Sequence, residues 1–200
     1  MKIAIYIGGL SGGGAERVVC NLSNYLARRH TVTILTMASD EPIELLDSNI
    51  IRVALDEERQ IDNFLMRNYK RYRNLKKYLK KSDDDVFIVM LPETTDILLS
   101  LRSLVKVPII VSERGNPVAR YKNSWIKRIL MHRLYPRADA FVFQTEEAKD
   151  YYLSEGISVE SSVIPNAINE AFLVSDYCGE KEKKIVAVGR LAPVKNFSLL

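Results

Sequence analysis

The sequence predicts an α/β fold: a Rossmann-like, doubly wound parallel sheet with helices on both faces. Short apolar runs rich in β-branched residues alternate with longer amphipathic stretches, which is typical of βαβ units. Most of these runs lack polar alternation, as expected for strands that are buried on both faces. The expected strands cover residues 2–7, 31–36, 50–55, 86–90, 108–112 and 140–143.

The segments between these runs have helical periodicity. In the first of them Val18, Leu22 and Leu26 recur four residues apart and therefore share one face. Two arginines follow in the last turn, where cations interact favourably with the helix dipole. The expected helices cover residues 14–29, 59–80, 94–104, 119–135 and 146–154.

The pattern changes near the end of the chain. Residues 1–168 form the first domain, and residues 169–184 mix serine, glycine, acids and lysines without apolar periodicity, which predicts a linker. Residues 185–200 then predict the first strand and turn of a second domain. A strand and helix start without partners indicate a fragment of a longer protein.

The composition excludes several classes of protein. Of the 200 residues, 47% are hydrophobic and 27% are charged, which is ordinary for a globular protein and excludes disorder. No run approaches the ~18 apolar residues of a membrane-spanning helix, so any membrane contact is expected to be peripheral. Cys20 and Cys178 lack metal-ligand spacing, so we expect free thiols, a reducing cytoplasm and no metal.

Positive charge is concentrated in two segments. Residues 63–81 contain eight Lys or Arg and no acid, and residues 114–138 contain seven and no acid. The rest of the chain has 14 basic and 25 acidic residues, a net charge of −11. This segregation predicts a negatively charged partner. Trp125 among these cations suits an anionic membrane surface, although its apolar neighbours can equally be the core-facing stripe of a helix.

A glycine-rich loop joins the first expected strand to the first expected helix. Five of the seven residues 8–14 are glycine, and Gly12, Gly13 and Gly14 immediately precede or begin the helix. Glycines let the backbone approach an anion, and a helix N-terminus favours phosphate, so we expect a diphosphate-binding loop. The pattern G-x-G-x-x-G is not met, because its sixth position is Arg17, and a plain turn is the alternative.

Several motifs together resemble a known family. They are the GGxER-type loop, VSERGNP (111–117), FVFQTEEAKDYY (141–152), VIPNAIN (163–169) and VGRLAPVKNFSLL (188–200). In this order they resemble retaining glycosyltransferases of family 4 that build bacterial capsule, exopolysaccharide or O-antigen. The resemblance implies the N-terminal, acceptor-side half of a GT-B fold, a nucleoside-diphosphate-sugar donor, a lipid-linked glycan acceptor and no cofactor.

The resemblance also implies residue roles. Arg190 and Lys195 of the last motif match the pair that holds the donor diphosphate, and Glu16 and Arg17 of the glycine loop match positions near the acceptor. Glu113 and Arg114 stand where many relatives have a histidine near the transferred sugar, so we expect a catalytic role for them; a structural salt bridge is the alternative.

Two acidic segments differ in their position relative to the strand 86–90. Glu93 follows the strand, where ligand sites gather in open α/β sheets, and is expected to contact the acceptor. Asp83 and Asp85 precede the strand, which favours a solvated turn over a metal site.

The leading hypothesis is a cytoplasmic glycosyltransferase, peripheral on the inner face of the cell membrane, of which this fragment alone is inactive. A nucleotide-sugar epimerase of the same fold is the first alternative. A nucleic-acid-binding module that stacks bases on Tyr69, Tyr72 and Tyr78 is the second. The glycine loop and the motif around Arg190 favour the transferase, so we expect no nucleic-acid partner.

Overall fold

The structure is a computed structural model that describes residues 1–39, 46–56, 64–167, 179, 183–189 and 196–199. It divides into two compact units, Met1–Ala167 and Ile168–Leu200. The first unit contains the whole sheet and every candidate site residue that is described. Of the expected linker 169–184, only residues 179, 183 and 184 are described.

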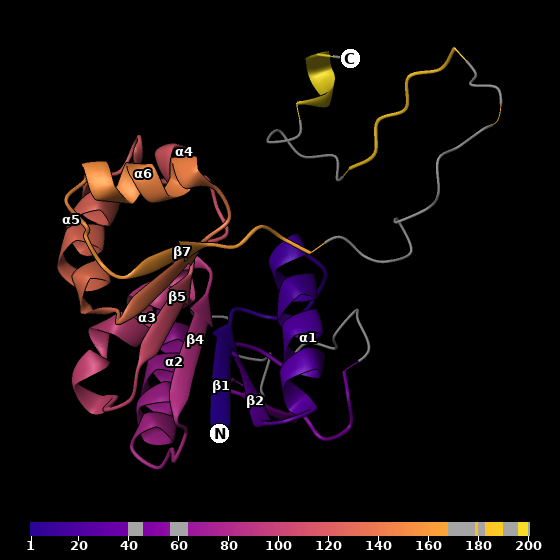
Figure 1. The fold of residues 1–200 in the computed structure, drawn as a ribbon. Helices are drawn as coiled ribbons and strands as arrows, with labels where there is room; N and C mark the ends of the chain where they lie inside the picture. The colour runs from indigo at the N-terminus through magenta and orange to yellow at the C-terminus, as the bar shows by residue number, and fades with distance from the viewer. Residues whose placement is uncertain (40–45, 57–63, 168–178, 180–182, 190–195, 200) are drawn as a thin grey trace. The chain divides into compact units, whose positions relative to one another are not determined.

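The first unit is built on a seven-stranded sheet in the order β3-β2-β1-β4-β5-β6-β7, with all neighbouring strands parallel (Figure 1). This confirms the predicted Rossmann-like, doubly wound α/β fold. The strands are β1 (Lys2–Ile7), β2 (Thr31–Thr36), β3 (Ile51–Ala54), β4 (Val86–Met90), β5 (Ile109–Ser112), β6 (Ala140–Phe143) and β7 (Ser161–Val163).

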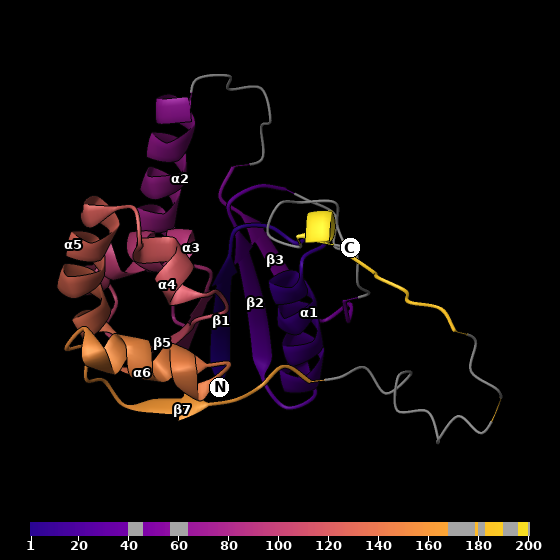
Figure 2. The same ribbon diagram turned by 90° about the horizontal axis from the view of Figure 1, so that it is seen from above.

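Helices cover both faces of this sheet (Figure 2). One face packs on α1, and the other packs on α2, α3, α5 and α6. The helices are α1 (Gly14–Ala27), α2 (Phe64–Leu79), α3 (Pro92–Ser100), α4 (Pro117–Tyr121), α5 (Trp125–Leu134) and α6 (Glu146–Ser154), with short 3-10 turns η1 (Arg102–Leu104), η2 (Tyr135–Arg137) and η5 (Phe197–Leu199).

The central strand β1 shows why its sequence forms a doubly covered strand. Ile3, Ile5 and Ile7 pack into the core on the α1 side, whereas Ala4 and Tyr6 pack into the core on the opposite side. Successive side chains of a strand point to opposite faces, so an unbroken apolar run fills both cores. Burial of this kind stabilises the fold by roughly 25 cal/mol per Å² of apolar surface.

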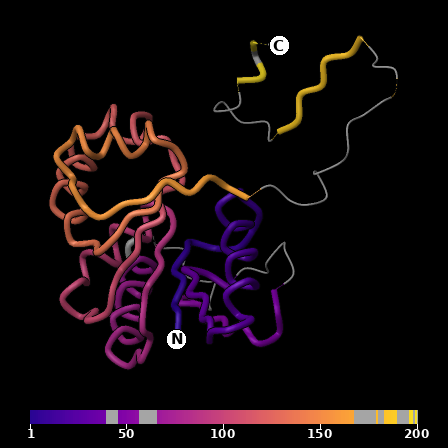
Figure 3. The backbone as a smooth tube through the Cα atoms, viewed as in Figure 1, coloured from indigo at the N-terminus to yellow at the C-terminus, as the bar shows by residue number. Residues whose placement is uncertain are grey.

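The helix expected over residues 119–135 is wrong, because two helices occupy this crossover between β5 and β6 (Figure 3). Asn116 caps α4 by accepting a hydrogen bond from the Ala119 N–H, and Pro117 takes the first helical position. Ser124 then caps α5 by accepting from the Lys127 N–H at 3.4 Å. Asn and Ser favour such caps over helix interiors, and the chain therefore restarts its helix at Trp125.

Other boundaries also differ from the sequence expectations. The strand β7 was not expected, because its three residues contain two serines and form no apolar run; it nevertheless pairs with β6. The helix α3 begins at Pro92 and ends at Ser100, before a 3-10 turn. The strand expected over residues 185–188 does not form, and Ile185 and Val188 are exposed there without a strand partner in the described part of the chain. Residues 185–200 as the start of a second domain remain a prediction.

None of the helices that the structure describes combines the length and the apolar character needed to cross a bilayer.

Candidate active site at the carboxyl edge of the sheet

The loops that follow β1, β4, β5, β6 and β7 meet at one edge of the sheet, the upper edge in Figure 1. All strands are parallel, so their carboxyl ends point the same way, and ligands of open α/β sheets bind at this edge. All candidate site residues that the structure describes lie at this edge. They are Gly12, Gly13, Gly14, Glu16, Arg17, Glu93, Glu113 and Arg114.

The glycine loop places a carboxylate at the start of α1. Gly12 has φ 116°, a conformation that strongly favours glycine, and Gly13 is the N-cap residue of the helix. A side-chain carbon added at Gly13 would collide with the carboxylate of Glu16, which folds back over the first turn. An anionic ligand that binds to Gly12, Gly13 and Gly14 must therefore displace Glu16. Arg17 is exposed in the same turn.

Glu113 follows β5 and is only 3% exposed. One carboxylate oxygen accepts from the Tyr152 hydroxyl at 2.9 Å, and the other accepts from the Gly115 N–H at 3.3 Å. Burial raises the pKa of Glu113, and these two hydrogen bonds oppose the increase. The carboxylate thus ties the β5–α4 loop to Tyr152 of α6, and a catalytic role for Glu113 remains a prediction.

Arg114 is half-buried at the same loop, and its guanidinium has neutral partners. Its Nε donates to Ser112 Oγ at 2.8 Å, and one terminal nitrogen donates to Asn166 Oδ1 at 2.6 Å. Burial lowers the pKa of Arg114. Within the described residues it has no carboxylate partner, so the salt bridge with Glu113 considered from the sequence does not form.

A pocket of about 320 Å³ opens beside Arg114. It lies between the β5–α4 loop and the beginning of α6, and Thr145 at its edge caps α6 by accepting from the Ala148 N–H at 3.2 Å. Its lining combines a guanidinium, amides, a hydroxyl and one carboxylate, which are groups that bind phosphates and sugar hydroxyls. The polar lining residues are Arg114, Asn116, Gln144, Thr145 and Glu147.

Glu93 lies in the first turn of α3, which begins at Pro92, shortly after the end of β4 at Met90. Its exposed carboxylate accepts from Arg120 of α4 at 3.1 Å, and the same guanidinium donates to Asp96 at 3.2 Å. Burial raises the pKa of Asp96 to about 6, although the charge of Arg120 lowers it. Glu93 is therefore held in an ion pair that joins α3 to α4, and its contact with an acceptor remains a prediction.

The remaining predicted sites lie elsewhere. Arg190 and Lys195 lie outside the described residues. Asp83 and Asp85 lie before β4, at the opposite edge of the sheet, where Asp83 pairs with the Lys2 ammonium and Asp85 accepts from the Lys2 backbone N–H at 2.7 Å. The part of the chain that the structure describes contains no cluster of His, Cys, Asp or Glu that could hold a metal ion. A larger pocket of about 440 Å³ lies between β3 and α2 and is separate from these loops.

Sequence reasoning missed the residues that organise this site. Tyr152 lies 39 positions after Glu113, and Asn166 lies 52 positions after Arg114, so no local pattern connects them. Both lie in motifs that were singled out, FVFQTEEAKDYY and VIPNAIN, but without an assigned role. Tyr152 also stacks on Phe143 and Tyr135, with ring centroids 5.4 Å and 5.6 Å apart, and these contacts hold its hydroxyl under the loop.

The fold is similar to those of solved glycosyltransferases and related proteins. The lipopolysaccharide outer core galactosyltransferase WaaB, in its apo form, has a TM-score of 0.60 at 17% identity, covering 84% of this chain and 46% of WaaB. HepE of Anabaena in complex with UDP-glucose has a TM-score of 0.62 at 11% identity, covering 84% of this chain and 44% of HepE. At these identities the likeness shows the fold.

Sequence similarity identifies the family. The chain is 30% identical, over 98% of its length and 54% of the relative, to an α-1,4-N-acetylgalactosaminyltransferase of Campylobacter jejuni whose name gives an undecaprenol-diphosphate-linked glycan as its substrate. It spans about half the length of the curated relatives it matches. The family model Glycosyltransferase Family 4 matches residues 12–172. The chain belongs to Glycosyltransferase Family 4.

Proposed function

We propose that the protein transfers a sugar, with retention of anomeric configuration, from a nucleoside-diphosphate sugar to a lipid-linked glycan or polysaccharide acceptor. In this proposal the transferred sugar is a hexose or an N-acetylhexosamine, and the chain is the acceptor-side half of the enzyme and inactive alone. Family membership over residues 12–172 and the similarity to a transferase that acts on an undecaprenol-linked glycan support this proposal over the epimerase alternative.

The observation that carries the proposal is the uncompensated charge of Arg114. Its guanidinium is partly withdrawn from water, bonds only neutral oxygens among the described residues and borders a pocket at the carboxyl edge. Cleavage of a sugar–phosphate bond leaves negative charge on the diphosphate, and a fixed cation in a partly desolvated site stabilises such charge. Arg114 accordingly contacts a phosphate of the donor or of the lipid-linked acceptor.

The other site residues support this contact indirectly. Glu113 fixes the loop that carries Arg114, because its carboxylate binds Tyr152 and the Gly115 N–H. The glycine loop accepts the donor diphosphate once Glu16 moves aside, and the released carboxylate then faces the acceptor together with Arg17. Arg190 and Lys195 hold the donor diphosphate, as the family resemblance implies.

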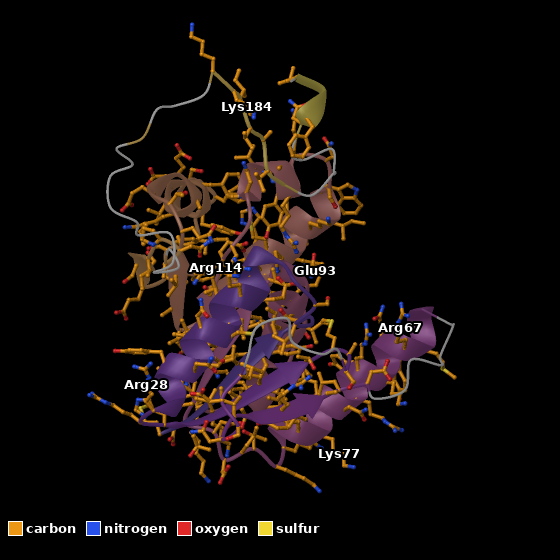
Figure 4. The ribbon with its side chains drawn as sticks, turned by 90° about the vertical axis from the view of Figure 1, so that its right-hand side faces the viewer. Arg28, Arg67, Lys77, Glu93, Arg114 and Lys184 are labelled. Carbon is orange, nitrogen blue, oxygen red and sulfur yellow. The ribbon has the colours of Figure 1, made fainter. Side chains whose placement is uncertain are left out.

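The proposed lipid-linked acceptor supports a location at a membrane. We assign it to the cytoplasm, peripheral on the inner face of the cell membrane and attracted by anionic lipids. The two acid-free segments support this assignment, because Leu75 of α2 and Met131 of α5 pack into the same core and both helices therefore cover the same face of the sheet. Figure 4 shows Arg67 and Lys77 on α2, apart from Arg28 on α1.

The test is sugar transfer by full-length protein from a panel of radiolabelled UDP-sugars to an undecaprenyl-diphosphate glycan. Arg114→Ala should lower kcat/KM on the order of 10²-fold, the typical loss for one charge-stabilising group. Arg114→Lys should recover only part of this loss, because an ammonium cannot reproduce the planar contacts to Ser112 and Asn166.

Arg137→Ala is the matched control, because Arg137 is exposed and precedes β6 at the opposite edge of the sheet. Its kcat/KM should stay within about twofold of the wild type. Unchanged kinetics in Arg114→Ala would remove Arg114 from the site. Failure to transfer from any donor would overturn the transferase assignment, and an inverted product, detected by NMR, would overturn retention.

A further inference from the structure

The first half of α5 consists of exposed residues, although the helix also contacts α3 and α4. Every residue from Trp125 to Leu130 is exposed, and only Met131 and Leu134 of this helix are buried. A surface helix normally turns its apolar stripe toward the core. Four apolar residues of α5 instead lie at the surface, with exposed fractions of 72% for Trp125, 54% for Ile126, 43% for Ile129 and 39% for Leu130.

These apolar residues form one surface. Trp125 and Ile129 are four positions apart, as are Ile126 and Leu130, so the two pairs lie side by side along the helix. Within the described residues no other element covers them. The surface, called the α5 face here, consists of Trp125, Ile126, Ile129 and Leu130 with the flanking cations Lys122 and Arg133.

The charge around the α5 face is positive. Lys122 and Arg133 are exposed and form no ion pair with any described residue. Arg128 and His132 lie on the flank toward α6, and there they pair with Glu155 at 3.1 Å and 3.0 Å. Residues 114–138 contain no acid, so no carboxylate from the helix itself opposes a negatively charged partner.

We propose that the α5 face docks on an anionic lipid bilayer, with Trp125 and Ile129 entering the interface and Lys122 and Arg133 contacting lipid phosphates. Exposed apolar side chains beside Lys122 and Arg133, which form no ion pair with any described residue, match the layered chemistry of a bilayer surface, where headgroup charge lies above acyl chains. Tryptophan in particular prefers this interface, because its ring is apolar and its N–H is polar. The inference rests on the membrane location proposed above but not on the sugar-transfer chemistry, so vesicle binding without sugar transfer would leave it standing.

Trp125 is the one tryptophan in the sequence, so intrinsic fluorescence reports on this surface directly. The chain is mixed with phosphatidylglycerol–phosphatidylethanolamine vesicles, and phosphatidylcholine vesicles provide the neutral comparison. The expected result is a shift of the emission to shorter wavelength and quenching by brominated lipid, with anionic vesicles only. Raising the salt concentration should weaken both effects, because exposed charges are screened over ~10 Å at 0.1 M.

In a vesicle co-sedimentation assay, one variant tests the cations of the α5 face and another tests its apolar residues. Lys122→Gln with Arg133→Gln should weaken partitioning by at most about 25-fold, roughly fivefold for each cation. Trp125→Ser with Ile129→Ser should also weaken it. Tyr25→Ser with Arg29→Gln is the matched control, because these exposed residues belong to α1 and its end, on the other face of the sheet, and their replacement should have no effect.

Four results would overturn the inference. These are an absence of vesicle binding at low salt, equal binding to neutral vesicles, binding that leaves the Trp125 emission unchanged, and concentration-dependent burial of Trp125 without lipid. The last result would mean that a second copy covers the face. Circular dichroism of each variant confirms that folding is intact, which is expected because all substituted residues are exposed.

Discussion

Replacing Tyr152 by Phe tests whether Glu113 is held as a buried carboxylate. The substitution removes one hydroxyl and keeps the ring, so the stacking of residue 152 on Phe143 and Tyr135 is preserved. Glu113, which is 3% exposed, then keeps the backbone hydrogen bonds from Gly115, at 3.3 Å, and from Arg114. The expected loss of stability therefore reports on the hydrogen bond to Glu113 together with the contact that the same hydroxyl makes with Tyr121.

The structure sets the size of this loss. A hydrogen bond to a charged group contributes about 1.5–3 kcal/mol, against about 0.5–1.5 kcal/mol for a neutral pair. The 2.9 Å bond is shorter than the 3.3 Å bond from Gly115, so we expect a loss of about 2–3 kcal/mol. At roughly 2–4 °C per kcal/mol for a chain of this size, Tm falls by about 4–12 °C.

The pKa shift of Glu113 determines how the stability loss of Tyr152→Phe changes with pH. Burial raises the pKa of Glu113 in the folded protein, so the stability contributed by this carboxyl is present below its ordinary pKa and is lost as pH rises through the folded value. The Tyr152 bond opposes this loss because it favours the ionised form. The deficit of Tyr152→Phe should consequently grow as pH rises from 4 to 8.

Thermal unfolding followed by circular dichroism measures the effect, in the wild type and in a Glu113→Gln background. A glutamine of the same shape accepts only a neutral hydrogen bond, so in that background Tyr152→Phe should cost no more than about 1.5 kcal/mol. Equal costs in the two backgrounds, or a deficit that is independent of pH, would refute the buried-carboxylate account.

Further predictions concern other parts of the first unit. Leu98→Ala should lower the free energy of unfolding by about 2–5 kcal/mol, because Leu98 is fully buried. Ile126→Ala should change it by less than about 0.5 kcal/mol, because Ile126 is exposed. Urea melts measure both losses, and similar losses would contradict the exposure of α5. Gly12→Ala should cost about 1–3 kcal/mol, since φ 116° strains any other residue, and a neutral result would argue against this turn. Burial raises the pKa of Asp96 from 3.8 to about 6, so its contribution to stability is lost as pH rises between those values. Asp96→Asn should therefore flatten the curve of unfolding free energy against pH in this window. An unchanged slope would show that Asp96 does not cause the pH dependence.

The sequence predicted the strands that are buried on both faces. β1, β2 and β4 consist of continuous apolar or β-branched runs, and such runs fit only a covered parallel strand. β7 was missed because Ser161 and Ser162 give it no apolar run, and it forms through backbone pairing with β6. The break between α4 and α5 was missed because the apolar spacing continues across it, while the capping groups of Asn116 and Ser124 interrupt the helix.

The site was predictable in position but not in detail. Motifs after strands point to the carboxyl edge, and Glu113 and Arg114 do lie there. Their different environments could not be predicted, because burial of Glu113 depends on Tyr152, and Arg114 depends on Asn166, both distant in sequence. Periodicity likewise places Trp125 and Ile129 on one helix face but does not say whether that face meets the core or the solvent.

The break in the β5–β6 crossover leaves the exposed first half of α5 apart from the residues that hold the β5–α4 loop. The β5–α4 loop is held by Glu113, Tyr152 and Asn166, and none of these residues belongs to α5. The exposed half of α5 is anchored at its far end by Met131 and Leu134, and so can take part in docking without moving Arg114. If both proposals hold, Trp125→Ser should reduce vesicle binding and turnover of a membrane-embedded acceptor while leaving turnover of a short, detergent-dispersed acceptor unchanged. An equal loss with both acceptors would mean that α5 shapes the site itself, and the separation between docking and transfer would then be wrong.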